Sequence, residues 1–106
     1  MKASLKSLSD NIAQANDLFY LNNKSLDTVI GIMDKSLRKQ GMQAEAISID
    51  CVPLNKKIVF LLHDAKPDQA DIAFGNKAGD INSTRQISLS ELTVPVILTF
   101  MQEYFT

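Results

Sequence analysis

Ile58-Val59-Phe60-Leu61-Leu62-His63 is the stretch that decides the expected fold, because its first five residues are all apolar. Side chains of a β-strand alternate between the two faces of a sheet. The even-numbered residues of this run therefore occupy one face, while Val59 and Leu61 occupy the other. A run that is apolar on both faces is typical of a strand in the middle of a sheet.

Alternating patterns on either side of this run predict its neighbours in an antiparallel sheet. Residues 47–51 alternate between apolar and polar side chains, and the turn-forming residues 53–56 separate them from the central run. Residues 70–74 have the pattern of a third strand, and residues 83–87 form a weak fourth candidate. The segment 75–80 between them is interpreted as a turn, because it lacks the glycine spacing and the Lys-Ser/Thr ending of a phosphate-binding loop.

Helical spacing marks the beginning of the chain, where apolar residues recur every three or four positions on two successive stripes. The first stripe consists of Leu5, Leu8, Ile12, Ala15 and Phe19. The second stripe consists of Leu26, Ile30, Met33 and Leu37. It is followed by Gly41, and glycine often ends a helix. The two stripes predict a helical hairpin, with one continuous bent helix as the alternative.

The end of the chain predicts another helix. Residues 94–105 are apolar around much of a helical wheel, Thr93 is suited to the N-cap, and Pro95 is compatible with the first turn. The segments, in the order α-α-β-β-β-(β)-α, predict an α+β fold with an N-terminal helical hairpin, an antiparallel sheet of three to four strands and a C-terminal helix. A length of 106 residues, 45% of them hydrophobic, fits a single globular domain over residues 1–106.

The apolar side chains on the second face of the central strand must also be buried from water. Helices confined to one side would leave Val59 and Leu61 exposed, and the C-terminal helix carries surplus apolar residues, among them Val96 and Phe100. Large exposed apolar patches are typical of subunit contacts. We therefore expect a homodimer with these four residues at the subunit interface. The alternative is a monomer of three layers, with the helical hairpin on one face of the sheet and the last helix on the other.

Composition argues against several classes of protein. The 11 basic and 12 acidic side chains give a net charge of −1, which is unlike a nucleic-acid-binding protein. No stretch approaches the roughly 20 apolar residues that span a bilayer, and no apolar run near the N-terminus resembles a signal peptide. Cys51 is the single cysteine, so an intrachain disulfide is not possible. The cytoplasm is the expected compartment.

One cluster has the residue types of a catalytic or metal site, namely His63 and Asp64, followed by Asp68 and Asp71. An imidazole beside carboxylates can act as an acid/base pair or bind a metal ion. Acidic residues are equally typical of turns, and a lone histidine offers no second nitrogen ligand. Cys51 is not expected to lie opposite His63, and a small core side chain is the simpler interpretation of that cysteine.

These observations predict a small non-enzymatic interaction or regulatory protein that acts as a homodimer. Its expected partners are a second copy of itself and an unidentified protein, without nucleic acid, membrane, cofactor or metal. The alternative is a small hydrolase or metal-dependent enzyme that uses the cluster of His63 and the three aspartates. Stabilisation by a divalent metal ion, abolished in His63→Ala, would favour the alternative.

Overall fold

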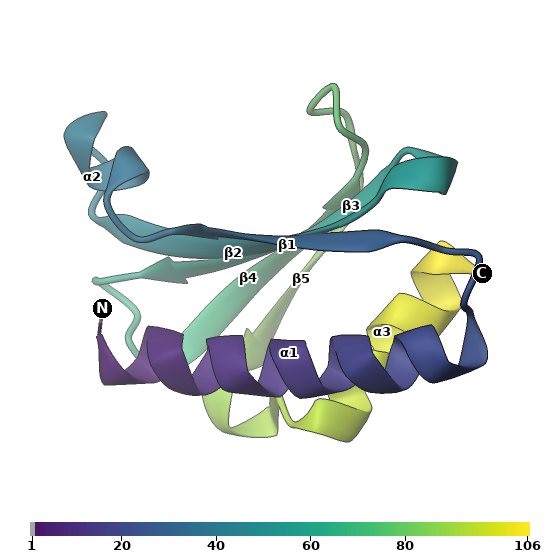
Figure 1. Cartoon of the computed structure of the whole chain (residues 1–106). Helices are drawn as coiled ribbons and strands as arrows, with labels where there is room; N and C mark the ends of the chain where they lie inside the picture. The colour runs from purple at the N-terminus through teal and green to yellow at the C-terminus, as the bar shows by residue number, and fades with distance from the viewer. Residues whose placement is uncertain (1) are drawn as a thin grey trace.

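The computed structural model describes residues 2–106 and contains one antiparallel sheet whose strand order follows the chain, β1-β2-β3-β4-β5. Each strand pairs with its neighbour in sequence (Figure 1). The strands are β1 (Thr28–Met33), β2 (Ala44–Cys51), β3 (Lys56–His63), β4 (Gln69–Gly75) and β5 (Ile81–Ser88). The apolar run that decides the fold thus lies in the central strand, as predicted.

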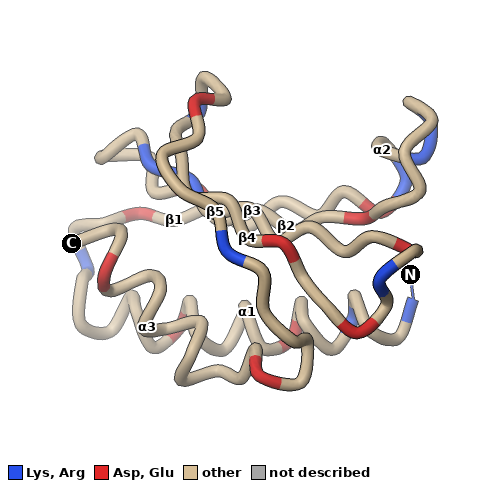
Figure 2. The backbone as a smooth tube through the Cα atoms, turned by 180° about the vertical axis from the view of Figure 1, so that it is seen from behind, with Lys and Arg blue, Asp and Glu red and all other residues tan. Residues whose placement is uncertain are grey.

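Two long helices lie together on one face of this sheet, in Figure 1 and in the opposite view of Figure 2. They are α1 (Ala3–Asn22) and α3 (Val94–Phe105). The single turn α2 (Ser36–Lys39) connects β1 to β2, and two 3-10 turns, η1 (Val52–Leu54) and η2 (Leu89–Glu91), follow β2 and β5. The α+β class is confirmed, with five strands instead of the predicted three to four.

The core fills the space between the helices and the sheet. The α1 stripe predicted from the sequence is buried over its whole length, from Leu5 to Phe19. Phe19 meets Phe105 of α3 edge-on at 5.9 Å between ring centroids, which joins the two helices. The sheet contributes the residues of one face, among them Ile47, Phe60 and Ile72, each with no exposed surface.

The start of α3 follows the sequence prediction. Thr93 occupies the N-cap position, where its side chain makes no capping hydrogen bond but its carbonyl accepts the first helical hydrogen bond from Ile97 at 3.0 Å. Pro95 lies in the first turn, where a missing N–H removes no helical hydrogen bond. The helix then directs Phe100 onto Phe74 of β4, with ring centroids 5.8 Å apart.

The second predicted helix is wrong, and so is the continuous bent helix. Residues 28–33 form β1, paired with β2, and only Ser36–Lys39 is helical. Apolar residues at 30 and 33 fit a helical stripe, but Thr28, Val29 and Ile30 are β-branched, and such residues favour strands. Pairing with β2 gives this short segment long-range hydrogen bonds that outweigh local periodicity.

The three-layer monomer is also excluded by the positions of the helices. α1 and α3 cover the same face of the sheet, whereas α2 and the connection from β4 to β5 rise on the other side, at different places (Figures 1 and 2). The face of the sheet opposite α1 and α3 is called the uncovered face below. It carries Val59 and Leu61, because they alternate with the buried Ile58, Phe60 and Leu62 along β3.

Candidate interaction surface

The uncovered face has an apolar centre. In the register of the sheet, Val59 lies between Ser48 of β2 and Ala73 of β4, and Leu61 lies between Ala46 and Asp71. Most of these neighbours have short side chains, so the valine and the leucine stand above them. Val59 and Leu61 are both half-buried, whereas the residues that alternate with them are buried.

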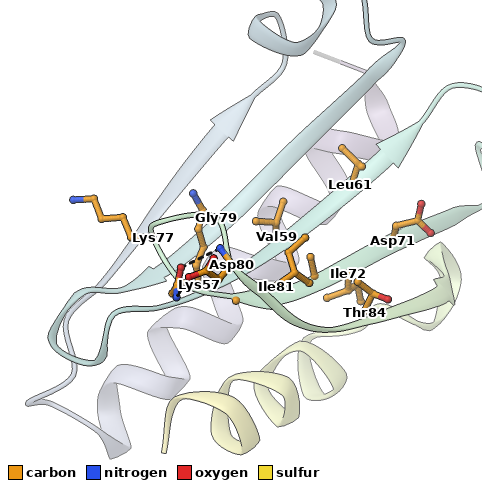
Figure 3. Close-up of a pocket in the computed structure, with 13 residues that line it drawn as sticks. Lys57, Val59, Leu61, Asp71, Ile72, Lys77, Gly79, Asp80, Ile81 and Thr84 are labelled. Carbon is orange, nitrogen blue, oxygen red and sulfur yellow. Dashed lines mark hydrogen bonds between the residues drawn. The ribbon is translucent and has the colours of Figure 1, made fainter.

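A hollow of about 410 Å³ opens beside these two residues (Figure 3). Val59, Leu61 and Ala73 lie on the sheet side of the hollow, and Ile81 from the start of β5 adds a further apolar wall. The connection between β4 and β5 completes the hollow through Asn76, Lys77, Gly79 and Asp80. Such a volume lies within the roughly 300–1,000 Å³ range of ligand pockets.

Residues 76–80 of the β4–β5 connection form one wall of the hollow, called the overhang. The path of the chain through this overhang depends on Gly75. A Cβ at this position would lie 2.0 Å from the backbone oxygen of Asp80, far inside contact distance. A register shift between β4 and β5 also falls at Phe74 and Gly75, which bends the strand there. Asp80 donates its N–H to the side chain of Asn76 at 3.2 Å, and this hydrogen bond closes the turn.

The two ends of the hollow differ in charge. Two lysines, Lys57 and Lys77, lie at one end in Figure 3 together with a single acidic residue, Asp80, whereas Asp71 lies at the other end without a lysine. Lys57 approaches Asp50 at 4.0 Å, and Lys77 has no ion pair within the part of the chain that the structure describes. The same two lysines line a second, adjoining hollow of about 260 Å³. A ligand with an apolar body and an anionic group matches this arrangement.

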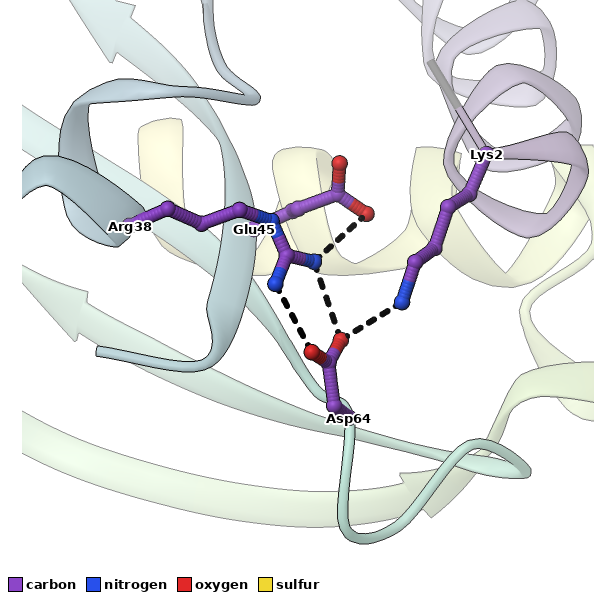
Figure 4. Close-up of polar contacts among 4 residues, drawn as sticks. All are labelled: Lys2, Arg38, Glu45 and Asp64. Carbon is purple, nitrogen blue, oxygen red and sulfur yellow. Dashed lines mark hydrogen bonds and ion pairs between the residues drawn. The ribbon is translucent and has the colours of Figure 1, made fainter. Parts of the chain in front are cut away.

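The predicted catalytic cluster is divided between separate contacts. His63 and Asp71 form a pair, with Nε2 and Oδ2 3.3 Å apart. Asp64 instead accepts two hydrogen bonds from Arg38, at 2.7 and 2.9 Å, and one from Lys2 at 2.7 Å (Figure 4). Asp68 is exposed, and its backbone oxygen accepts a hydrogen bond from the N–H of Leu89.

Asp64 is neutralised by its two basic partners. The two hydrogen bonds from Arg38, and then the one from Lys2, hold the pKa of Asp64 well below its usual range. The same contact raises the pKa of Arg38. Arg38 also approaches the carboxylate of Glu45 at 3.6 Å. A carboxylate held in this way is a poor proton acceptor, so the contacts of Asp64 favour a structural role.

Cys51 lies apart from His63, as expected from the sequence. Cys51 pairs with Lys56 and His63 pairs with Ala44, at opposite ends of the ladder between β2 and β3. The thiol is buried, and burial raises the pKa of Cys51. Within residues 2–106, no three side chains of the His, Cys, Asp and Glu types gather closely enough to hold a metal ion.

The four residues expected at a subunit interface do not form one surface. Val59 and Leu61 lie on the uncovered face, while Val96 and Phe100 belong to α3 on the opposite side of the sheet. Phe100 is only 5% exposed. Sequence reasoning missed the contribution of Ile81 and of the β4–β5 connection, for which the two glycines of residues 75–80 are the only local signal.

Comparison of the chain with models of protein families, with curated proteins and with solved structures finds no match. Among residues 2–106, the helices are too short or too polar to cross a membrane.

Proposed function

We propose that this protein is a small non-enzymatic interaction protein of the cytoplasm that acts as a homodimer and binds an apolar segment of another protein on its uncovered face. The observation that carries the proposal is the hollow beside Val59 and Leu61, on a face that neither long helix covers. The lysines at one end of the hollow favour a segment that carries an acidic residue next to its apolar side chains.

Burial of Val59 and Leu61 supplies the driving force for such binding. Removing apolar surface from water contributes about 25 cal/mol per Å². Two half-buried aliphatic side chains and Ile81, which is 62% exposed, therefore contribute a few kcal/mol when a partner covers them. The hollow is shaped by backbone contacts of the β4–β5 connection, so little ordering is required before binding.

A binding role, in preference to catalysis, is supported by the separation of the acidic residues. His63 and Asp71 form a pair, but Asp64 is held by cations and Asp68 lies in an exposed loop. General acid–base chemistry requires groups that converge on one substrate position. The contacts of these four residues give no such convergence.

The dye 1-anilinonaphthalene-8-sulfonate provides a direct test, because it combines an apolar ring system with an anionic group. We expect the folded protein to enhance its fluorescence, and Leu61→Gln to weaken dye binding about tenfold through a loss of about 1.4 kcal/mol. Leu21→Gln is the matched control, since Leu21 is 64% exposed on α1, and it should leave dye binding unchanged. Equal dye binding by the wild type and Leu61→Gln would contradict the proposed site.

Catalysis can be tested separately with activated esters and phosphate esters. The proposed function predicts no turnover above that of buffer, with or without divalent metal ions. Turnover that disappears in His63→Ala would overturn the non-enzymatic assignment. Circular dichroism of each variant establishes that the fold is retained.

A further inference from the structure

The strand β1 forms one free edge of the sheet and exposes apolar side chains on both faces. Its sequence, Thr28-Val29-Ile30-Gly31-Ile32-Met33, contains no charged residue and no proline. Val29 is 55% exposed on the uncovered face, and Ile32 is 43% exposed on the side of the helices. Proteins usually protect free edges with charges, prolines or bulges, so an apolar edge of this kind is suited to pairing with another strand.

The backbone of β1 also has hydrogen-bonding groups to offer. The N–H of Val52 donates to the carbonyl of Asp27 at 3.1 Å, one position before β1 begins. Residues of an antiparallel strand alternate in the side to which their backbone groups point. Thr28, Ile30 and Ile32 therefore direct their N–H and C=O groups away from β2, toward the free edge.

The opposite edge, β5, differs from β1 in polarity, in charge and in the regularity of its pairing. β5 is mostly polar, and seven of its eight residues are exposed. It carries Arg85, whose guanidinium lies 5.5 Å from the ring centroid of Phe100, and its pairing with β4 is interrupted by a register shift. A charge and an irregular ladder are devices that discourage strand addition. Self-association is therefore favoured at β1.

We propose that β1 pairs antiparallel with β1 of a second copy of this chain, about a two-fold axis perpendicular to the sheet. This pairing rests on the homodimer of the proposed function and assigns its interface. With Gly31 opposite Gly31 of the second copy, Val29 lies opposite Met33 and Ile30 lies opposite Ile32. Apolar residues then meet apolar residues on both faces, with about four backbone hydrogen bonds from Ile30 and Ile32.

Charges beyond the ends of β1 select this register. With Gly31 on the axis, Asp27, just before β1 of each copy, lies beside the bend that follows β1 of the other copy and is within reach of Lys35 in that bend, so two pairs of opposite charge flank the apolar centre. Neither residue has an ion pair within the described residues of one chain. A shift that places Ile30 on the axis would bring Asp27 opposite Met33. The Gly31-centred register is the one that is complementary in both charge and apolar surface.

The elements next to β1 leave its edge accessible. Arg38 binds Asp64, just beyond the end of β3, and α2 contacts β2, so α2 is tied toward these strands and not toward the free edge of β1. α1 lies on the helix-covered side, and the chain from α1 reaches β1 from that side (Figure 1). The joined sheet of two copies keeps all four long helices on one side, and both uncovered faces stay open on the other.

Sedimentation velocity over a wide range of protein concentration tests this pairing. We expect a dimer for the wild type and for Ser83→Lys, because Ser83 lies on the helix side of the β5 edge. Ile32→Lys places the same charge on the helix side of the β1 edge and should weaken the dimer at least about tenfold. Dimerisation that survives Ile32→Lys, or a wild type that sediments as a monomer, would overturn the proposal.

A charge exchange tests the register without touching the strand. Asp27→Lys and Lys35→Asp should each weaken the dimer, because each places like charges opposite one another, and the double variant should restore it. Failure of the double variant to recover would contradict the Gly31-centred register. Dye binding separates this proposal from the uncovered face: Ile32→Lys should bind the dye as the wild type does, and Leu61→Gln should still dimerise.

Discussion

Neighbouring residues of β3 experience two different environments. Phe60 has no exposed surface because α1 and α3 cover its face of the sheet. Val59 and Leu61, on either side of it in the chain, are equally apolar but remain half-buried on the uncovered face. Hydrophobicity along a strand identifies apolar surfaces on both faces, whereas the placement of the helices decides which of these surfaces is buried in the core and which one stays partly exposed.

Both long helices lie on one face because they pack against each other as well as against the sheet. The rings of Phe19 and Phe105 meet at 5.9 Å, and the side chain of Asn11 donates a hydrogen bond to the backbone oxygen of Leu92 just before α3. A helix on the opposite face would lose these contacts. Both long helices therefore cover the same face of the sheet, and the opposite face has no long helix.

The largest expected effect comes from truncating one residue on each face. Phe60→Ala should lower the free energy of unfolding by about 3–5 kcal/mol, because it removes a fully buried ring. Leu61→Ala should cost less than about 1.5 kcal/mol, since the leucine is already partly hydrated. Urea denaturation measures both values on the Ile32→Lys background, where dimerisation does not contribute. Equal losses would show that both faces are covered in solution.

An intermediate effect is expected at the overhang of the hollow. Gly75→Ala should lower the free energy of unfolding by about 1–3 kcal/mol and weaken dye binding, because its Cβ would meet the backbone of Asp80. Gly41→Ala is the control away from the hollow: it strains a residue with φ +88°, its Cβ meets no atom within 4 Å, and it should leave dye binding unchanged. Unchanged dye binding in Gly75→Ala would show that the overhang does not shape the site.

The smallest effect concerns Asp64, which links the two sides of the sheet through Lys2, just before α1, and Arg38 of α2 (Figure 4). Its pKa is lowered in the folded state by these partners, so its contribution is present above the ordinary value of about 4 and is lost as the pH falls below it. Thermal unfolding at several pH values should show a steeper acid loss for the wild type than for Asp64→Asn. Solvent screening keeps the difference small. Parallel pH profiles would contradict the role of this ion pair.

Much of the fold could be predicted from local pattern. Five residues of α1 repeat at helical spacing and are all buried, and the alternation in residues 47–51 corresponds to part of β2. β1 could not be distinguished in this way, because apolar residues at 26, 30, 33 and 37 fit a helical stripe and the pairing of Ile30 with Ile49 is a contact distant in sequence. Helix placement was also beyond local pattern, since it depends on contacts between the two ends of the chain.

The site was predicted only in part. Val59 and Leu61 were identified as surplus apolar residues, because alternation alone assigns them to the second face of β3. The overhang above them could not be predicted from the sequence. Its shape depends on the close approach of Gly75 to Asp80 and on the register shift at Phe74 and Gly75. The charged cluster was divided for a similar reason: the sequence holds His63 and Asp64 side by side, but Arg38 and Lys2 bind the aspartate from distant segments.

The most direct measurement of the central claim is the solvent accessibility of single methyl groups in the protein in solution. Nuclear magnetic resonance of methyl-labelled protein, with a soluble paramagnetic agent, reports how closely water approaches each side chain of β3. We expect strong relaxation of the Val59 and Leu61 methyl groups and little for Ile58 and Leu62, because the proposed dimer leaves the uncovered face open. Equal protection of all four residues would contradict this account.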